Sequence, residues 1–120
     1  MPMIEEINYP EAQPIDGYGP GFFRIAGQAL QGPILVSPWS VTGWGGFDDL
    51  AMPLGLVGKI DVLFIGTGSD IAHAPRAFRA VLETAGIGVE VMNSPAACRT
   101  YNVLLSEGRL IAAALIPVST

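Results

Sequence analysis

The stretch IDVLFIGTGSD, residues 60–70, decides the fold of this chain. Its apolar run up to Ile65 is typical of a β-strand that is covered on both faces, and Gly66 and Gly68 then end the strand in a turn. A strand that runs into a Gly-x-Gly turn often contacts the phosphate of a nucleotide, but the same pattern also occurs in ordinary loops of α/β domains. A phosphate site and a plain strand-end turn are therefore the two interpretations of this stretch.

Downstream of this strand, the sequence alternates between helical and strand patterns. A helix is expected over residues 75–86, because Pro75 suits its first turn and Gly86 its end, and residues 88–92 form the next strand. Ser94 is the predicted N-cap of a second helix that reaches about residue 106, and residues 109–116 form the last strand. Short connections between alternating elements predict a βαβαβ unit with right-handed crossovers.

Upstream, the pattern is that of short strands and turns. Residues 1–16 are acidic and proline-containing and are expected to form a mobile arm, followed by one domain over residues 17–120. Residues 22–25 and 33–37 are predicted strands of an antiparallel hairpin or meander, and residues 37–50 are predicted to be a loop. The predicted fold class is α/β, a single layered domain with a central mixed β-sheet.

The composition argues against several classes of function. The net charge is −5, and the six Lys and Arg residues are scattered singly, so nucleic acid is not an expected partner. One cysteine and one histidine give no metal cluster, and no cofactor is predicted. Residues 25–47 carry no charge, but their glycines and prolines argue against a membrane span. The early glutamates and the lack of a signal-like apolar run favour a cytoplasmic protein.

The nucleotide interpretation of the opening stretch is the weaker one. A dinucleotide fingerprint requires a third glycine where this chain has Ile71, and no Walker lysine is present. Glu90 lies 24 residues after Gly66, near the spacing of an acid that binds a ribose. The following helix begins near Pro75, however, too far from Gly68 for its amides to reach a pyrophosphate. A plain strand-end turn is favoured.

A small ligand would be expected at the carboxyl ends of the parallel strands. There residues 66–70 and 93–99 should be neighbours, and together they supply flexible backbone, a helix start, an acid and an arginine. The candidate ligand-binding residues of this rim are Gly66, Thr67, Gly68, Asp70, Ser94, Arg99 and Asn102. On the helix, Arg99 and Asn102 share a polar stripe, and such a stripe is more often simply a solvated face.

Cys98 is the one candidate nucleophile of interest. It follows a helix start and precedes Arg99, and both features favour a thiolate. It also falls at the margin of the apolar helix face, where a small buried thiol is the commoner role. The only histidine, His73, lies in another loop. The buried role is favoured, and no catalytic residue is predicted.

The aromatic side chains of the uncharged N-terminal half suggest an interface. Trp39 and Trp44 lie in a stretch rich in glycine and proline, where two indole rings are hard to bury completely. Exposed aromatic side chains in such loops often anchor protein contacts. Trp39 and Trp44 are therefore the candidate interface residues, and the expected partners are other proteins or a second copy of this chain.

Three segments together resemble the Mth938-domain family: GYGPGFFRIAG (17–27), FIGTG (64–68) and AGIGVEVMNSPAACRTYNVLLSEGRLIAAALIP (85–117). The most specific part is ACRTYN at residues 97–102, followed by EGR at residues 107–109. This family of small α/β proteins includes a mitochondrial respiratory complex I assembly factor and bacterial proteins of unknown function. The resemblance implies a single domain with a central mixed sheet and flanking helices, and it carries over no catalytic residues.

The expected function is therefore a non-enzymatic, protein-binding role of the assembly type. The alternative is a protein that binds a small molecule such as an anion or a nucleotide, or a minor enzyme, at the rim formed by residues 66–70 and 93–99.

Overall fold

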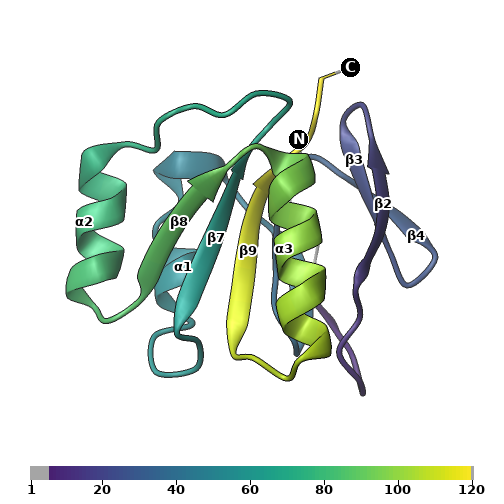
Figure 1. Cartoon of the computed structure of the whole chain (residues 1–120), viewed down its shortest axis with the longest axis horizontal. Coiled ribbons are helices and arrows are strands. Elements are labelled where there is room, and N and C mark those ends of the chain that lie inside the picture. The colour runs from purple at the N-terminus through teal and green to yellow at the C-terminus, as the bar shows by residue number, and fades with distance from the viewer. Residues whose placement is uncertain (1–5, 120) are drawn as a thin grey trace.

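The computed structural model of this chain describes residues 6–119, which form two β-sheets and three α-helices. The strands are β1 (Ile7–Asn8), β2 (Ile15–Gly19), β3 (Phe22–Ile25), β4 (Gln28–Gln31), β5 (Ile34–Val36), β6 (Ser40–Gly43), β7 (Val62–Thr67), β8 (Gly88–Met92) and β9 (Ile111–Ile116). The helices are α1 (Ala51–Leu54), α2 (Arg76–Thr84) and α3 (Ser94–Ser106), and a 3-10 turn, η1, spans Gly46–Asp48. Figure 1 shows these elements around the central sheet.

The central sheet is six-stranded and mixed. Its order is β1-β6-β5-β9-β7-β8, and a separate three-stranded antiparallel sheet has the order β2-β3-β4. Strand β7 runs parallel to both β8 and β9, so the chain forms the predicted βαβαβ unit. Strands β5, β6 and β1 extend the sheet antiparallel beyond β9. The predicted fold class is thus confirmed.

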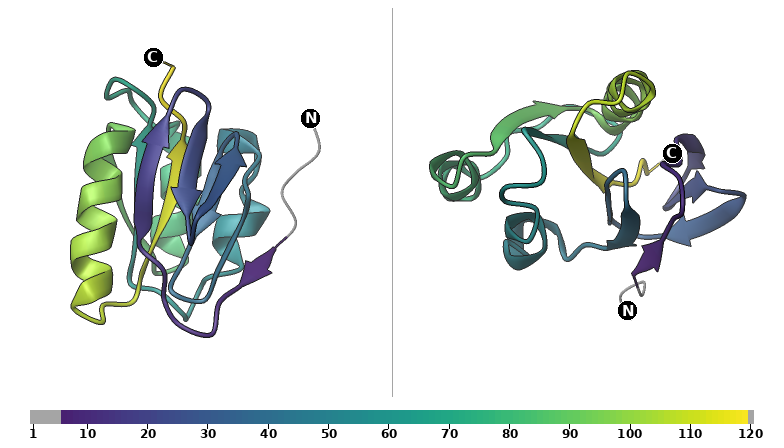
Figure 2. Two further views of the ribbon diagram at one scale, coloured as in Figure 1. Left: turned by 90° about the vertical axis from the view of Figure 1, so that its right-hand side faces the viewer. Right: turned by 90° about the horizontal axis from the view of Figure 1, so that it is seen from below.

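The central sheet is covered on both faces. Helices α1 and α2 lie on one face, while α3 and the small sheet lie on the other, as the right-hand view of Figure 2 shows. Strand β9 illustrates the division, because Ala113 and Leu115 belong to the α3 side of the core and Ala112 and Ala114 to the opposite side. Leu63, Phe64 and Ile65 of β7 are at most 3% exposed, as the continuous apolar run predicts.

The start of α3 differs in detail from the prediction. The N-cap is Asn93, whose Oδ1 accepts a hydrogen bond from the Ala96 amide at 2.9 Å. Ser94, predicted to be the cap, is the first helical residue, and its hydroxyl is used elsewhere. Asn and Ser are comparable N-caps, so the local sequence did not distinguish between these neighbours.

The N-terminal half contains more regular structure than predicted. Residues 1–5 of the expected mobile arm lie outside the described residues, whereas Ile7–Asn8 pair with β6. The predicted meander is the small sheet, but β5 leaves it and pairs with β9.

The prediction of a loop over residues 37–50 was wrong at residues 40–43, which form β6. The Ser37 hydroxyl accepts hydrogen bonds from the Trp39 and Ser40 amides, each at 3.3 Å. These bonds close a tight turn that returns the chain beside β5. The glycines and serines around this turn are typical of loops, so the sequence did not indicate the strand.

Candidate functional site

The rim predicted to bind a small ligand is held together by hydrogen bonds within the protein. The Gly68 amide donates to Ser94 Oγ at 2.8 Å, and the Ser94 amide donates to the Gly68 carbonyl at 2.8 Å. Ser94 Oγ in turn donates to the carbonyl of Ile116. One serine that is 1% exposed thus joins the ends of β7 and β9 to the start of α3. The amide and hydroxyl that an anion would need are already engaged inside the protein.

Gly66 allows α3 to approach β7 closely. A Cβ atom at this position would lie 2.7 Å from Ser94 Oγ and 2.8 Å from Leu115 Cδ2. Gly68 has a different role, since its φ of +98° is a conformation that favours glycine. Both glycines therefore have a structural reason to be present, which supports the strand-end turn as the interpretation of this stretch.

The other residues of the predicted rim have separate roles. Thr67 Oγ1 donates to the Asp70 carbonyl at 2.7 Å and accepts from the Ala72 amide at 3.0 Å, which holds the loop after β7 in shape. Asp70 is exposed. The structure thus brings Gly66, Thr67, Gly68 and Ser94 together, but their polar groups face one another.

Asn102 lies apart from this rim and fastens α3 to the small sheet. Its Oδ1 accepts from the Ile15 amide at 2.8 Å, and its Nδ2 donates to the Ile15 carbonyl at 2.9 Å. Arg99 is exposed on α3 and lines a shallow groove together with Thr100, Val103 and Leu104. The stripe shared by Arg99 and Asn102 thus combines a solvent-facing side chain with a structural one. The 87-residue separation of Asn102 from Ile15 left no local signal of their contact.

Cys98 is buried in the α3 side of the core. It is 4% exposed, and burial raises the pKa of its thiol from 9.0 to about 12, while the Arg99 charge acts in the lowering direction. The thiol form therefore prevails at neutral pH. The structure favours the buried role over a reactive one.

Trp44, predicted as an interface residue, is a core residue. It is 1% exposed, and its Nε1 donates to the Asp49 carbonyl at 3.0 Å. The ring packs edge-on against Phe47 with centroids 5.6 Å apart, and its centroid lies 6.0 Å from that of Phe78 on α2. The turn after β6 folds over the sheet and covers the indole, which the glycine-rich sequence did not indicate. This side chain offers no surface to a partner.

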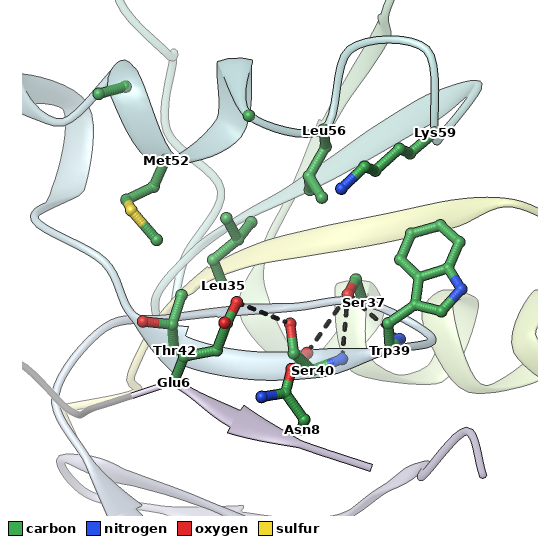
Figure 3. Close-up of a pocket in the computed structure, with 12 residues that line it drawn as sticks. Glu6, Asn8, Leu35, Ser37, Trp39, Ser40, Thr42, Met52, Leu56 and Lys59 are labelled. Carbon is green, nitrogen blue, oxygen red and sulfur yellow. Dashed lines mark hydrogen bonds between the residues drawn. The ribbon is translucent and has the colours of Figure 1, made fainter. Parts of the chain in front are cut away.

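Trp39 is 41% exposed and lies at the rim of a cavity of about 340 Å³. The cavity is bounded by β5 and β6 on one side and by α1 with the turn that follows it on the other (Figure 3). Its lining residues are Glu6, Asn8, Leu35, Ser37, Trp39, Ser40, Thr42, Ala51, Met52, Gly55, Leu56 and Lys59.

The lining of this cavity, here named the Trp39 cavity, is chemically divided. Leu35, Met52 and Leu56 form an apolar part, and hydroxyl and carboxylate groups lie across from α1 (Figure 3). On the polar side, Ser40 Oγ donates to Glu6 Oε2 at 3.3 Å. Lys59, the only lysine of the chain, extends toward the cavity beside Leu56. The cavity could thus receive a side chain with an apolar body and a polar end.

Sequence reasoning identified Trp39 but missed the rest of this cavity. Glu6 and Lys59 stand far apart in the chain, and Lys59 follows a turn that looks like any exposed connection. That Lys59 is the single lysine of the chain was the one sequence feature that could have drawn attention to this cavity.

Within residues 6–119, no helix has the length and apolar character needed to cross a membrane. The same residues contain no cluster of three or more His, Cys, Asp or Glu side chains suited to hold a metal ion.

Comparison with protein families gives a match over residues 15–116 to a family described as "Protein of unknown function (DUF498/DUF598)". An uncharacterized protein of Rhodobacter capsulatus is 50% identical over 113 residues, which cover 94% of this chain and 91% of that protein. The human NADH dehydrogenase [ubiquinone] 1 alpha subcomplex assembly factor 3 is 34% identical over 114 residues. These cover 89% of this chain but only 62% of the assembly factor, which is therefore the longer protein.

Solved structures show the same fold. A crystal structure described as an outer membrane protein from Bartonella henselae superposes with a TM-score of 0.83 at 37% identity, covering 92% of this chain and 98% of that one. A solution structure from Bordetella pertussis, described as a Mth938-like domain, has a TM-score of 0.73 at 24% identity, with coverages of 88% and 85%.

Proposed function

Because this chain belongs to the DUF498/DUF598 family, the Mth938-like proteins, we propose that it is a protein-binding protein of the assembly type, acting without catalysis of its own. The observation that carries the proposal is the similarity of 89% of this chain to the human assembly factor. We infer that the domain which this chain shares with the assembly factor is a part that binds other proteins. Its single cysteine, buried as a thiol, suits the cytoplasm as the place of action.

The Trp39 cavity supports this proposal as the contact site. An exposed tryptophan beside a cavity with an apolar part is the arrangement that often dominates the energy of a protein interface. Trp39 contributes the exposed ring, and the half-buried Met52 and Leu56 offer apolar surface to an inserted side chain. Lys59 and Glu6 at the cavity supply opposite charges that would orient a partner.

The alternative of a small-molecule site at the rim receives less support. The Gly68 amide and the Ser94 hydroxyl are bonded to each other, and the space above Gly66 is filled by Ser94. A ligand would have to displace these contacts before it could bind.

The test begins with a photo-cross-linking amino acid at position 39 in the native organism. A control variant carries the same amino acid at Val103, which is 56% exposed on α3. A protein cross-linked from position 39 but not from position 103 is then purified and its affinity for the wild type measured. Subunits of respiratory membrane complexes are the first candidates to compare, given the names of the longer relatives.

Trp39→Ala should weaken the measured complex about 30-fold, the effect of a hot-spot side chain worth about 2 kcal/mol. Val103→Ala should leave the affinity within about threefold, as expected of an exposed residue outside the contact. Equal binding by the wild type and Trp39→Ala, or the absence of any cross-link specific to position 39, would contradict the proposal.

A further inference from the structure

Strand β4 is an open edge of the small sheet. It pairs with β3 on one side, and no strand of residues 6–119 pairs with its other side. In Figure 1 it lies at the right-hand side of the molecule. An open edge presents unpaired amides and carbonyls, which natural proteins normally cover or protect.

The register of the hairpin determines which main-chain groups face outward. Ile25 is opposite Gln28 across a turn formed by Ala26 and Gly27, with φ of 52° and 79°, and the next pairs follow in order. In an antiparallel ladder, residues that exchange hydrogen bonds alternate with residues that do not. The tight turn and the bond from the Gly32 amide to the Gly21 carbonyl, at 2.9 Å, place Leu30 in a bonded pair. Ala29 and Gln31, on either side of Leu30, therefore direct their amides and carbonyls away from β3.

This edge lacks the usual protective features. The exposed side chains of β4 are Gln28, Ala29 and Gln31, so the strand has no charge and no proline. The other edge of the same sheet is protected, because β2 has an irregular register between Ile15 and Gly17 and is fastened to α3 through Ile15. Within the small sheet, β4 is therefore the unprotected edge.

We propose that β4 pairs antiparallel with β4 of a second copy of this chain, across a two-fold axis at Leu30. In this register, Ala29 lies opposite Gln31 of the partner subunit, and each such pair exchanges both of its main-chain hydrogen bonds. The two small sheets join into one continuous antiparallel sheet. The same surface patch is used by both copies, as a two-fold interface requires.

The edge fits a second copy because it is complementary to itself. The outward donors and acceptors of Ala29 and Gln31 are placed symmetrically about Leu30, so one copy matches the other without a shift of register. Neither side carries a charge, so no like charges face each other in the ladder. Leu30, a member of the α3-side core that is 7% exposed, would lie beside Leu30 of the partner subunit.

The inference does not depend on the proposed function. The dimer uses main-chain groups of β4, whereas the partner contact proposed above uses Trp39 and the cavity beside α1. Either one can fail while the other holds.

Sedimentation velocity over a series of protein concentrations tests the dimer. The wild type should sediment as a dimer at the upper concentrations, and a variant with both Ala29→Lys and Gln31→Lys should sediment as a monomer, because lysines then face lysines. The variant with both Ala29→Glu and Gln31→Glu should also be a monomer. Mixing the two variants should restore the dimer, since Lys at position 29 then faces Glu at position 31.

The matched control adds the same charge elsewhere, through Ala77→Lys together with Ala80→Lys on the exposed side of α2. It should dimerise like the wild type, and thermal unfolding should show that all variants are folded. A wild type that is monomeric throughout, or a double-lysine variant that dimerises as well as the wild type, would overturn the proposal. A mixture of the two charged variants that stays monomeric would overturn the Leu30-centred register.

Discussion

Replacing Gly66 with Ala provides a quantitative test of how tightly α3 packs on β7. The added Cβ would lie 2.7 Å from Ser94 Oγ, 2.8 Å from Leu115 Cδ2 and 2.9 Å from Ser94 Cα. Ser94 Oγ cannot turn aside without losing its bonds to the Gly68 amide and the Ile116 carbonyl. The Cα atom is part of the helix, so relief requires α3 to move.

Overpacking of a buried site typically costs about 1–3 kcal/mol. Because one of the close contacts is to the main chain, we expect the upper end, a loss of about 3 kcal/mol in the free energy of unfolding. With a urea slope of about 1.5 kcal/mol per molar, the unfolding midpoint should fall by about 2 M. Fluorescence of the buried Trp44 and the exposed Trp39 provides the measurement.

Two other glycines separate sterics from backbone conformation. Gly17→Ala meets no atom within 4 Å and has an ordinary φ, so its effect should stay within about 0.5 kcal/mol. Gly58→Ala also meets no atom within 4 Å, but its φ of +82° should cost about 1–2 kcal/mol through backbone strain alone. If Gly66→Ala loses no more stability than Gly17→Ala, the space above Gly66 is open. The small-ligand interpretation of the rim would then regain its basis.

Three further outcomes concern Cys98 and the two tryptophans. Because burial raises the pKa of Cys98 to about 12, a thiol reagent at pH 8 should label the native protein far more slowly than the urea-unfolded chain. Equal labelling rates for the two states would contradict the burial of this thiol. As the pH rises above about 9, the Cys98 thiol ionises in the unfolded chain before it does so in the folded protein. This group should therefore lower the free energy of unfolding between that pH and 12. Urea titration of a Cys98→Ala control should not show this part of the fall in stability. Trp44→Ala should reduce the free energy of unfolding by about 3–5 kcal/mol, whereas Trp39→Ala should change it by less than about 1 kcal/mol. Similar urea midpoints for the two variants would refute the assignment of Trp44 to the core and Trp39 to the surface.

The α/β class and the order of the elements from β7 onward could be predicted from the amino-acid sequence. The apolar run before Gly66 predicted a strand buried on both faces, and β7 is such a strand. Prolines and glycines at the ends of α2 and α3 predicted the extent of both helices closely. These features are local, because periodicity and end signals act within a few residues, and local patterns can be read directly from a sequence. The set of motifs also identified the family, which the match over residues 15–116 confirms.

Tertiary structure alone decided which polar and aromatic side chains are exposed. Trp39 and Trp44 lie in the same kind of sequence, yet one is at a cavity rim and the other is in the core, because the turn after β6 folds back over the sheet. Ser94 and Asn102 looked like members of one polar rim, but Ser94 binds the ends of two strands and Asn102 binds Ile15, 87 residues away. Burial and hydrogen-bond partners depend on which distant segments pack together, and the spacing of residues along the chain carries no record of that packing.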